Sequence, residues 1–271
     1  MGDSGPEARA EASRWTWGIG AALVALAAAG ALAVVRPWMA VLPLGLFLVA
    51  CAAAPFFPAW GFFGKTVVRG RAEPPGVALT FDDGPHPSTT GPLLDLLRER
   101  RVRAAFFVVG RHAAAHPDLV RRMAAEGHEV GNHSASHDVW LMLRGSRTVL
   151  REIRNGNEAL AAVGVRTLAF RPPVGIVGPR LFPALRRQGM FAVGFSRRAR
   201  DFGNRRVSGL AQRLLPEVRP GDIVLLHDGA VAAEGGAEQW LDEVRRVLDG
   251  LVAMGLAVRP LSEHIDRPIL G

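Results

Sequence analysis

Two adjacent aspartates at the end of an apolar segment constrain this chain more than any other feature. The sequence TFDDGP at 80–85 continues the apolar residues 77–79 and passes directly into a Gly-Pro turn. This pattern predicts a buried strand over 76–81 that ends in two carboxylates. Because neighbouring carboxylates repel each other, the pair requires a cation or an arginine close by.

Strand-like and helix-like segments alternate from that first strand to the end of the chain. Short apolar runs predict seven strands, at 76–81, 104–109, 129–132, 167–170, 191–195, 222–226 and 257–260. Helical periodicity predicts helices between them, at 92–101, 118–126, 147–163, 179–187, 210–218 and 237–254. Such alternation is typical of parallel strands with right-handed crossovers, in an open sheet or a closed barrel.

The placement of polar residues favours the barrel. Several predicted strands are followed by side chains capable of acid, base or ligand chemistry: Asp82, Asp83, His133, Arg171, Asp201 and His227. Functional groups on a (β/α) barrel gather at the carboxyl ends of many strands, whereas an open sheet binds at one switch point. We therefore expect a barrel of seven strands.

Two histidines four residues apart complete a set of metal ligands. His133 and His137 can bind one ion together if the segment after their strand coils. With one carboxylate of the aspartate pair, they form a His₂–carboxylate set that leaves positions open for water and substrate. Neighbouring serines and Asn132 offer hydrogen bonds that would fix the imidazole tautomers. The sequence thus predicts a divalent metal site.

The remaining carboxylate is a candidate general base for water at that metal. Arg171 is a candidate to orient this base through a two-pronged contact and to keep it ionised. His227 is the candidate proton donor to a leaving amine, and Asp201 its candidate partner. Structural alternatives exist, because a strand-end aspartate often caps a turn and a strand-end histidine often satisfies nearby polar groups.

Four ordered blocks of this sequence resemble the polysaccharide deacetylases with the NodB-homology domain, also called carbohydrate esterase family 4. The blocks are TFDDGPHP at 80–87, GHEVGNHSASH at 127–137, FRPPVG at 170–175 and GDIVLLHD at 221–228. The similarity covers about residues 76–262. It implies a distorted seven-stranded (β/α) barrel and metal-dependent removal of acetyl groups from N-acetylated aminosugars.

The resemblance also implies separate roles for the two aspartates. Asp83, His133 and His137 resemble the metal ligands of the family, and Asp82 resembles its catalytic base, which Arg171 orients. The ion in such enzymes is commonly Zn²⁺, with Co²⁺ and other divalent ions as alternatives.

His227 resembles the catalytic acid of the family, and Asp201 the aspartate that tunes this acid. Val174 stands where the family usually has tyrosine, and its backbone N–H still serves the oxyanion site. Phe202 stands where tryptophan is usual. Both departures affect the aromatic wall for sugar stacking, for which the chain offers three candidates: Phe195, Phe202 and Trp140.

Two uncharged apolar runs precede the catalytic segment, at 17–35 and 38–63, separated only by Arg36 and Pro37. Each can cross a bilayer, which takes about 20 apolar residues. The short Arg-Pro break favours a transmembrane helical hairpin. In one alternative, 17–35 is a single signal anchor and the second apolar run lies at the membrane interface. The catalytic domain would then lie on the opposite side of the membrane from that expected for a hairpin. A lipoprotein cleavage box at Cys51 is another.

The expected organisation is a polar tail (1–14), a membrane segment (15–63), a linker (64–75) and a deacetylase domain (76–271). We expect residence in a bacterial-type cell membrane. Basic residues flank both apolar runs while only Arg36 lies between them, which slightly favours cytoplasmic termini. The side of the catalytic domain stays open.

The net charge of +8 comes without a nucleic-acid motif, so no nucleic-acid partner is expected. Its arginines either cover solvated helix faces or attract anionic lipids and a phosphorylated lipid-linked sugar. The expected substrate is an N-acylated aminosugar, in a glycan or linked to a lipid. Two alternatives remain: a deformylase or deacetylase specific for a polyprenyl-phosphate-linked aminosugar, and an inactive carbohydrate-binding scaffold.

Overall fold

The structure is a computed structural model that describes residues 16–231 and 235–271. The chain divides into two compact units. The first contains the chain up to Lys65 and the loop Ile176–Pro179, and the second contains Thr66–Gly175 and Arg180–Gly271. The predicted polar tail at 1–14 lies outside the described residues.

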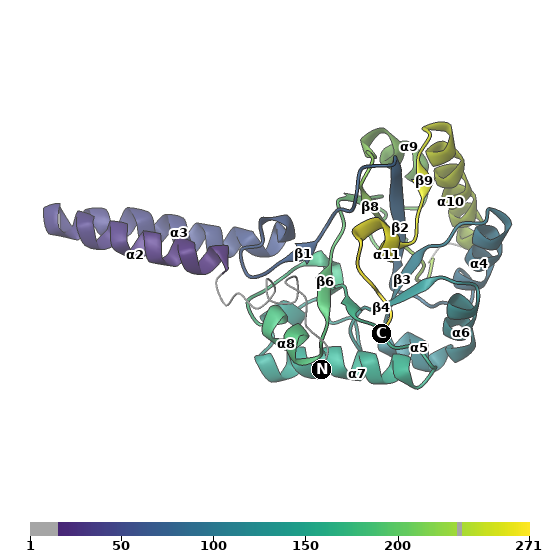
Figure 1. The fold of residues 1–271 in the computed structure, drawn as a ribbon, viewed down its shortest axis with the longest axis horizontal. Helices are drawn as coiled ribbons and strands as arrows, with labels where there is room; N and C mark the ends of the chain where they lie inside the picture. The colour runs from purple at the N-terminus through teal and green to yellow at the C-terminus, as the bar shows by residue number, and fades with distance from the viewer. Residues whose placement is uncertain (1–15, 232–234) are drawn as a thin grey trace, which may run out of the picture. The chain divides into compact units, whose positions relative to one another are not determined.

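Two apolar helical segments lie side by side in the N-terminal unit (Figure 1). Helix α2 has the predicted bounds, Trp17–Val35, and the Thr16 side chain accepts a hydrogen bond from its first turn. After the Arg36-Pro37 break the chain continues through four helical elements: η1 (Pro37–Ala40), α3 (Val41–Ala53), η2 (Ala54–Phe56) and η3 (Pro58–Trp60).

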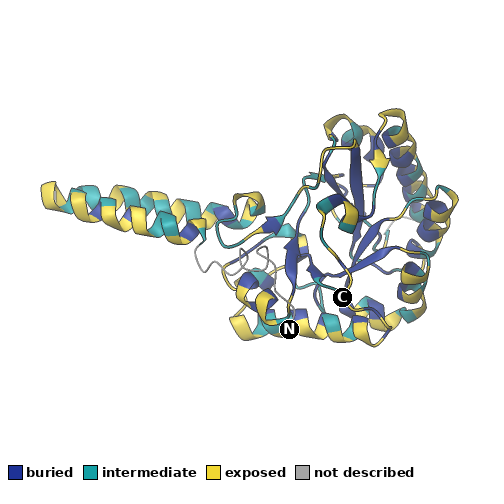
Figure 2. Ribbon diagram, viewed as in Figure 1, coloured by how far each residue is buried: buried dark blue, intermediate teal, exposed yellow. Residues whose placement is uncertain are grey.

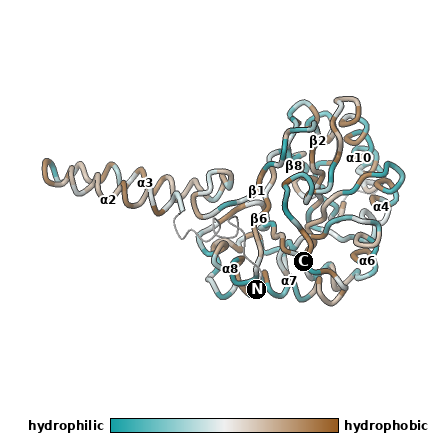
Figure 3. The backbone as a smooth tube through the Cα atoms, viewed as in Figure 1, coloured by the Kyte–Doolittle hydropathy of each residue, from teal (hydrophilic) through white to brown (hydrophobic). Residues whose placement is uncertain are grey.

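The residues of this helical pair are mostly apolar along its whole length, as the colour of the backbone trace indicates (Figure 3). Helix α2 buries only Gly18, Ala25 and Ala29, and α3 buries none of its residues. A helix that is apolar all round needs apolar surroundings. The segments Trp17–Val35 and Pro37–Phe56 are long and apolar enough to cross a membrane, by length and composition alone. Membrane insertion therefore stays a prediction.

A curled sheet of parallel strands forms the second unit (Figure 1). Its spatial order is β1-β6-β5-β4-β3-β2-β8-β7, and β9 pairs with β2 off this path. The strands are β1 (Thr66–Val67), β2 (Gly76–Asp82), β3 (Ala105–Val108), β4 (Glu129–Asn132), β5 (Ala169–Phe170), β6 (Phe191–Val193), β7 (Arg197–Arg198), β8 (Ile223–His227) and β9 (Ala257–Val258).

The prediction of a seven-stranded barrel is wrong in strand number and in closure. All seven predicted strands are present, and β1 and β7 add two more. Six of the predicted strands lie on the sheet path, which has eight strands with β1 and β7 at its two ends, and the seventh, β9, lies off it. Among the described residues β1 and β7 do not pair, so the sheet is a curled half-barrel. Both end strands are two residues long, too short for a recognisable pattern, and β1 lies in the segment expected to be a linker.

Helices connect most of the strands and pack around the sheet (Figure 1). They are α4 (Thr90–Glu99), α5 (Gly110–Ala115), α6 (Pro117–Ala125), α7 (Ser146–Ala161), α8 (Leu181–Arg187), α9 (Leu210–Leu214), α10 (Gly236–Ala253) and α11 (Leu261–Ile265). The sequence did not predict α5 and α11, because six and five residues are too few for helical periodicity.

Strand β2 lies at the centre of the core, and all seven of its residues are buried (Figure 2). It pairs with β3 on one side and β8 on the other, with Asp82 opposite Phe107 and His227. Asn132, at the end of β4, is likewise opposite Phe170 at the end of β5. Parallel register therefore brings the carboxyl ends of these strands level with one another.

His128 is a buried histidine in this framework, only 2% exposed. Its Nδ1 accepts the Ala104 N–H at 3.2 Å, and its ring lies edge-on to Phe106. Burial lowers the pKa of His128 to about 4. The ring is thus neutral in the fold at pH values where it is protonated in the unfolded chain.

We predict that His128 makes this fold sensitive to acid. Because the unfolded chain binds more protons between about pH 6.5 and 4, the free energy of unfolding should fall as pH drops through that window. His128→Gln keeps an acceptor for Ala104 and does not titrate. Denaturant unfolding of the full-length protein at pH 7 and 4.5 should show an acid-induced loss smaller by about 2 kcal/mol in the variant. Equal losses would contradict this account.

Candidate metal centre

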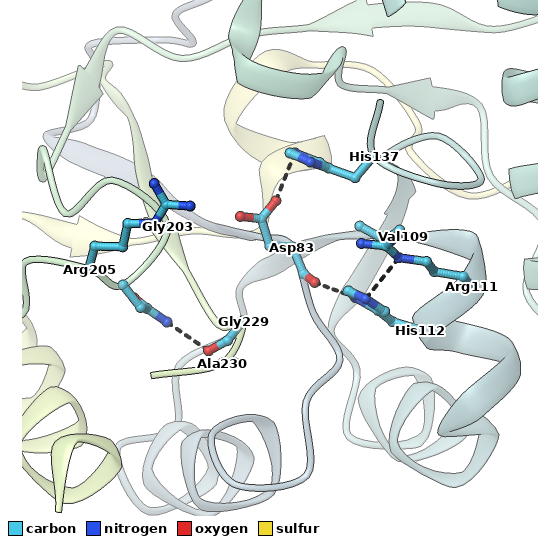
Figure 4. Close-up of a pocket in the computed structure, with 10 residues that line it drawn as sticks. Asp83, Val109, Arg111, His112, His137, Gly203, Arg205, Gly229 and Ala230 are labelled. Carbon is cyan, nitrogen blue, oxygen red and sulfur yellow. Dashed lines mark hydrogen bonds and ion pairs between the residues drawn. The ribbon is translucent and has the colours of Figure 1, made fainter. Parts of the chain in front are cut away.

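Asp83, His133 and His137 place their ligand atoms within 4.8 Å of one another. Asp83 Oδ1 lies 3.1 Å from His137 Nε2 and 3.5 Å from His133 Nε2, and Figure 4 shows Asp83 and His137 facing each other. This oxygen is buried and has no hydrogen-bond partner among the described residues. A divalent ion between the oxygen and the two nitrogens would satisfy all three, so the donor set fits Zn²⁺ or a similar ion.

Three residues at this site have backbone conformations that residues other than glycine rarely adopt. Asp83, Ser134 and His137 have φ values of 74°, 66° and 56°. Left-handed conformations of non-glycine residues cost about 1–3 kcal/mol each in unfavourable cases and cluster at functional sites. This backbone strain supports a ligand-binding role for the loop after β2 and for the loop after β4.

Hydrogen bonds fix the imidazole of His133 and the loop that carries His137. His133 Nδ1–H donates to the Arg171 carbonyl at 2.7 Å, which leaves the Nε2 lone pair facing Asp83. The Ser134 hydroxyl accepts the His137 N–H at 2.9 Å, and Asn132 Oδ1 accepts the Ser134 N–H at 2.8 Å. The predicted serine and Asn132 contacts thus hold the loop backbone, and a carbonyl rather than these side chains sets the His133 tautomer.

Electrostatics keep the aspartate ligand ionised. Burial acts to raise the pKa of Asp83, but the imidazoles of His133 and His137 outweigh it and hold this pKa well below its usual range. The carboxylate is therefore charged and available as a ligand at neutral pH.

Asp82 and Arg171 form a buried ion pair beside the ligands. Arg171 Nη1 lies 2.6 Å from Asp82 Oδ1, and Asp82 Oδ2 lies 3.7 Å from His133 Nε2. The predicted two-pronged contact is wrong, because a single guanidinium nitrogen reaches the carboxylate. Nη1 also donates to the Thr80 hydroxyl and Nη2 to the Gly194 carbonyl, both at 2.8 Å. Arg171 thus ties three strands together while it holds Asp82.

His227 and Asp201 form the second predicted pair. His227 Nδ1–H donates to Asp201 Oδ1 at 2.8 Å, and Asp201 is only 1% exposed. Burial acts to lower the pKa of His227, but the hydrogen bond and charge of Asp201 outweigh it and raise this pKa to about 9. His227 is therefore protonated at neutral pH.

Val174 also lies in a strained loop, the 3₁₀ turn η5 (Pro173–Gly175). Its φ of 54° is left-handed, which is uncommon for a β-branched residue. The neighbouring Gly175 has no room for a side chain, since a Cβ there would lie 2.9 Å from the Phe195 ring. Val174 is half exposed, so its position is accessible to a substrate.

The three aromatic candidates for sugar stacking differ in exposure. Phe202 is 64% exposed and Trp140 is 62% exposed, whereas Phe195 is partly buried. Trp140 is therefore not a core residue. Phe202 and Trp140 offer faces that a sugar ring can reach.

Sequence reasoning missed Asp228, a fully buried carboxylate behind the site. Its Oδ1 accepts the Gly84 N–H at 3.1 Å and its Oδ2 accepts the Thr90 hydroxyl at 2.7 Å. A Cβ on Gly84 would come within 2.2 Å of this carboxylate, so only glycine fits there. Burial raises the pKa of Asp228 to about 7. Asp228 therefore anchors the turn that follows Asp83. Its position directly after His227 is the feature of the sequence that could have identified it as part of the site.

Sequence reasoning also missed His112, on helix α5. Its Nδ1–H donates to the Asp83 carbonyl at 2.7 Å, and its Nε2 accepts from Arg111 Nε at 3.2 Å (Figure 4). No motif marks this residue, because α5 was not predicted.

Comparison with known proteins points to one family. A sequence model of the family described as polysaccharide deacetylase matches residues 69–193. The chitooligosaccharide deacetylase of Sinorhizobium fredii is 36% identical over 208 residues, which cover 74% of this chain and 96% of that protein. The peptidoglycan-N-acetylglucosamine deacetylase of Bacillus cereus is 35% identical over 189 residues, covering 69% of this chain and 86% of the relative.

A solved structure shares the fold. The crystal structure of a peptidoglycan N-acetylglucosamine deacetylase superposes with a TM-score of 0.69 at 26% identity. The match covers 75% of this chain and 94% of that one. The curled parallel sheet described above is therefore the fold of these enzymes.

We predict that Zn²⁺ stabilises the protein through Asp83 and the two histidines. At a concentration 100 times its Kd, a ligand of the folded state contributes about 2.7 kcal/mol. For a domain of this size that raises Tm by about 5–10 °C. Thermal unfolding with and without Zn²⁺ should show the rise in the native protein and in Asp82→Asn, but not in Asp83→Asn or His137→Gln. The same rise in all four proteins would exclude this ligand set.

Proposed function

This chain belongs to the polysaccharide deacetylase family, and we propose that it is a metal-dependent hydrolase that removes N-acetyl groups from aminosugars. One observation carries the proposal: beside the ligand set Asp83, His133 and His137 lie the carboxylate of Asp82, paired with Arg171, and the imidazole of His227, whose pKa is raised to about 9. Amide hydrolysis requires such a base and such an acid.

Asp83, His133 and His137 would hold the ion, with Zn²⁺ expected first and Co²⁺ or another divalent ion as alternatives. When bound, such an ion polarises a carbonyl and lowers the pKa of water. The oxygen and nitrogen donors of these residues suit that chemistry, and the buried Asp83 oxygen without a partner supports it.

Asp82 is the proposed base. It accepts a proton from the attacking water while the water oxygen bonds to the acyl carbon. Arg171 donates to Asp82 Oδ1 at 2.6 Å, which leaves Oδ2 on the side of His133 to take that proton. The backbone N–H of Val174 is the proposed donor to the negative oxygen that develops on the acyl group.

His227 is the proposed acid. As the carbon–nitrogen bond breaks, the imidazolium gives its proton to the amine nitrogen, and acetate and the free aminosugar are released. Asp201 holds the ring by its Nδ1–H, so Nε2–H is the proton that can be transferred.

We also propose that residues 15–63 form a membrane segment, with a tail at 1–14, a linker at 64–75 and the catalytic domain at 76–271. The two apolar helices of sufficient length support this, in a bacterial-type cell membrane. The enzyme would then act where membrane lipids and cell-wall or lipid-linked glycans meet. The names of the relatives support chitooligosaccharide or peptidoglycan N-acetylglucosamine as substrate classes.

A second candidate is hydrolysis of an acetyl or formyl group on a polyprenyl-phosphate-linked aminosugar, which the apolar helices favour because they keep the enzyme beside lipid-carried substrates. The full-length protein in detergent with Zn²⁺ should be given chitooligosaccharides, peptidoglycan fragments and such a lipid-linked sugar in parallel. Acetate or formate release from the soluble glycans supports the first candidate. Release from the lipid-linked sugar alone supports the second, and no release supports an inactive scaffold.

Reporter enzymes fused after Phe63 would determine which side of the membrane the catalytic domain faces. A cytoplasmic result would support action on a lipid-linked precursor before export. An outward result would exclude the cytoplasmic version and support action on assembled glycans.

We predict that Asp82→Asn lowers turnover by about 100- to 10,000-fold, the range expected for loss of a general base. The measurement is acetate release by full-length protein saturated with Zn²⁺. Asp118→Asn makes the same chemical change on an exposed helix and serves as the control. Full activity of Asp82→Asn would refute its role as base.

We predict that Asp201→Asn shifts the alkaline limb of kcat/KM to lower pH. His227 must be protonated to act as an acid, so activity should fall as pH rises through its pKa of about 9. Without the Asp201 charge that pKa should fall by about 1–2 units. The measurement is the pH profile of both proteins between pH 6 and 10. An unchanged alkaline limb would show that Asp201 does not tune the acid.

A further inference from the structure

A cavity of about 300 Å³ opens beside the metal ligands Asp83 and His137. Several loops at the carboxyl edge of the sheet supply its wall, together with helix α5. In the view of Figure 4, Arg111 and Arg205 lie on opposite sides of Asp83. The cavity can therefore hold a group attached to the sugar whose acyl group is cleaved.

Among the described residues, the side chains that line this cavity carry more positive than negative charge. Arg111 and Arg205 line it, and among the residues that the structure describes (16–231 and 235–271) Asp83 is the only acidic side chain that does. Asp83 already faces the two imidazoles. Neither arginine pairs with a carboxylate of the described residues, whereas Arg200 in the same loop as Arg205 lies 3.5 Å from Glu217.

The structure holds one of these arginines in place. Because His112 donates its Nδ1–H to the Asp83 carbonyl, its Nε2 is free to accept from Arg111 Nε at 3.2 Å. This contact uses Nε alone and leaves the two terminal nitrogens of Arg111 as donors. The guanidinium is thus linked to the backbone of a metal ligand through a single imidazole.

A buried polar group in the same wall also lacks a partner. Asn204 is only 2% exposed, and its Nδ2 donates to the Gly229 carbonyl at 2.8 Å. Its Oδ1 has no hydrogen-bond partner among the described residues. A buried acceptor without a partner is energetically unfavourable, and a hydroxyl or amide N–H of a ligand would satisfy it.

We infer that Arg111 and Arg205 form a subsite for an oxyanion, a phosphate or a carboxylate, carried by the aminosugar substrate. Asn204 Oδ1 would accept a hydrogen bond from the sugar that carries it. Guanidinium groups bind such oxyanions through paired N–H donors. A neutral chitooligosaccharide leaves both arginines without a partner. The inference rests on the proposed deacetylase activity and narrows its substrate to anionic aminosugars.

The test compares one glycan with and without an oxyanion. Full-length protein with Zn²⁺ is given N-acetylchitotriose, its 1-phosphate, and a peptidoglycan disaccharide that carries a muramic acid carboxylate. We expect kcat/KM at low salt to be at least about 10-fold higher for one of the two anionic substrates than for the neutral one. The favoured substrate shows whether phosphate or carboxylate is recognised.

Arg111→Gln and Arg205→Gln should each lower this preference by about 3- to 10-fold. Arg166→Gln is the matched control. Arg166 is exposed and lies before β5, whereas the site lies after the other end of that strand. Equal kcat/KM for neutral and anionic substrates in the native protein would overturn the inference, as would a preference unchanged in both cavity variants.

A binding measurement tests the oxyanion subsite independently of the proposed deacetylase activity. If no substrate is hydrolysed, the proposed function fails, and calorimetry with N-acetylglucosamine 1-phosphate then decides the subsite. Weaker binding by at least about 5-fold in Arg111→Gln and Arg205→Gln, but not in Arg166→Gln, would support it. Equal binding by all proteins, or none by the native protein, would refute it.

Discussion

The buried ion pair of Arg171 and Asp82 is the interaction on which the rest of the site depends. Removing two charges from water costs several kcal/mol per ion, so such a pair persists only when hydrogen bonds satisfy the remaining donors. Arg171 meets this condition through Thr80 and Gly194, and its guanidinium lies 3.9 Å from the Phe107 ring centroid. Thr80 and Phe107 belong to β2 and β3, whereas Gly194 follows β6, beyond β4 and β5 in the sheet. The sheet must therefore have its native strand order and curl before the charges can pair.

The same register determines where the proposed catalytic groups lie. Asp82 and His227 are paired residues of the adjacent parallel strands β2 and β8, so the proposed base and acid lie at the same level of the sheet. Each then receives a different partner. Arg171 is a cation and keeps Asp82 an acceptor, whereas Asp201 is an anion and keeps His227 a donor. Opposite partners thus give neighbouring positions opposite proton-transfer roles.

Sequence alone predicted the seven strands that it named and the three residues of the candidate metal site that the structure brings together, because both rest on local signals. Apolar runs of three or more residues mark β2, β3 and β8, and the polar residues that follow β2 and β8 are explicit in the chain. The end strands β1 and β7 depend on pairing with distant segments, which no local pattern encodes. The closure of the sheet depended on those two strands, and it was predicted wrongly for that reason.

The groups that sequence reasoning missed act through contacts between segments distant in the chain. Asp228 and His112 lie far from Asp83 in sequence, yet one holds the turn after it and the other its carbonyl. Arg111 and Arg205, which line the cavity, are also far apart in the sequence. A count of basic residues cannot distinguish them from arginines on solvated helices. This chain has no tyrosine, so stacking on a sugar depends on phenylalanine and tryptophan rings such as the exposed Phe202 and Trp140. Paired guanidinium groups offer another means of holding a substrate, one whose strength falls as salt screens the charges.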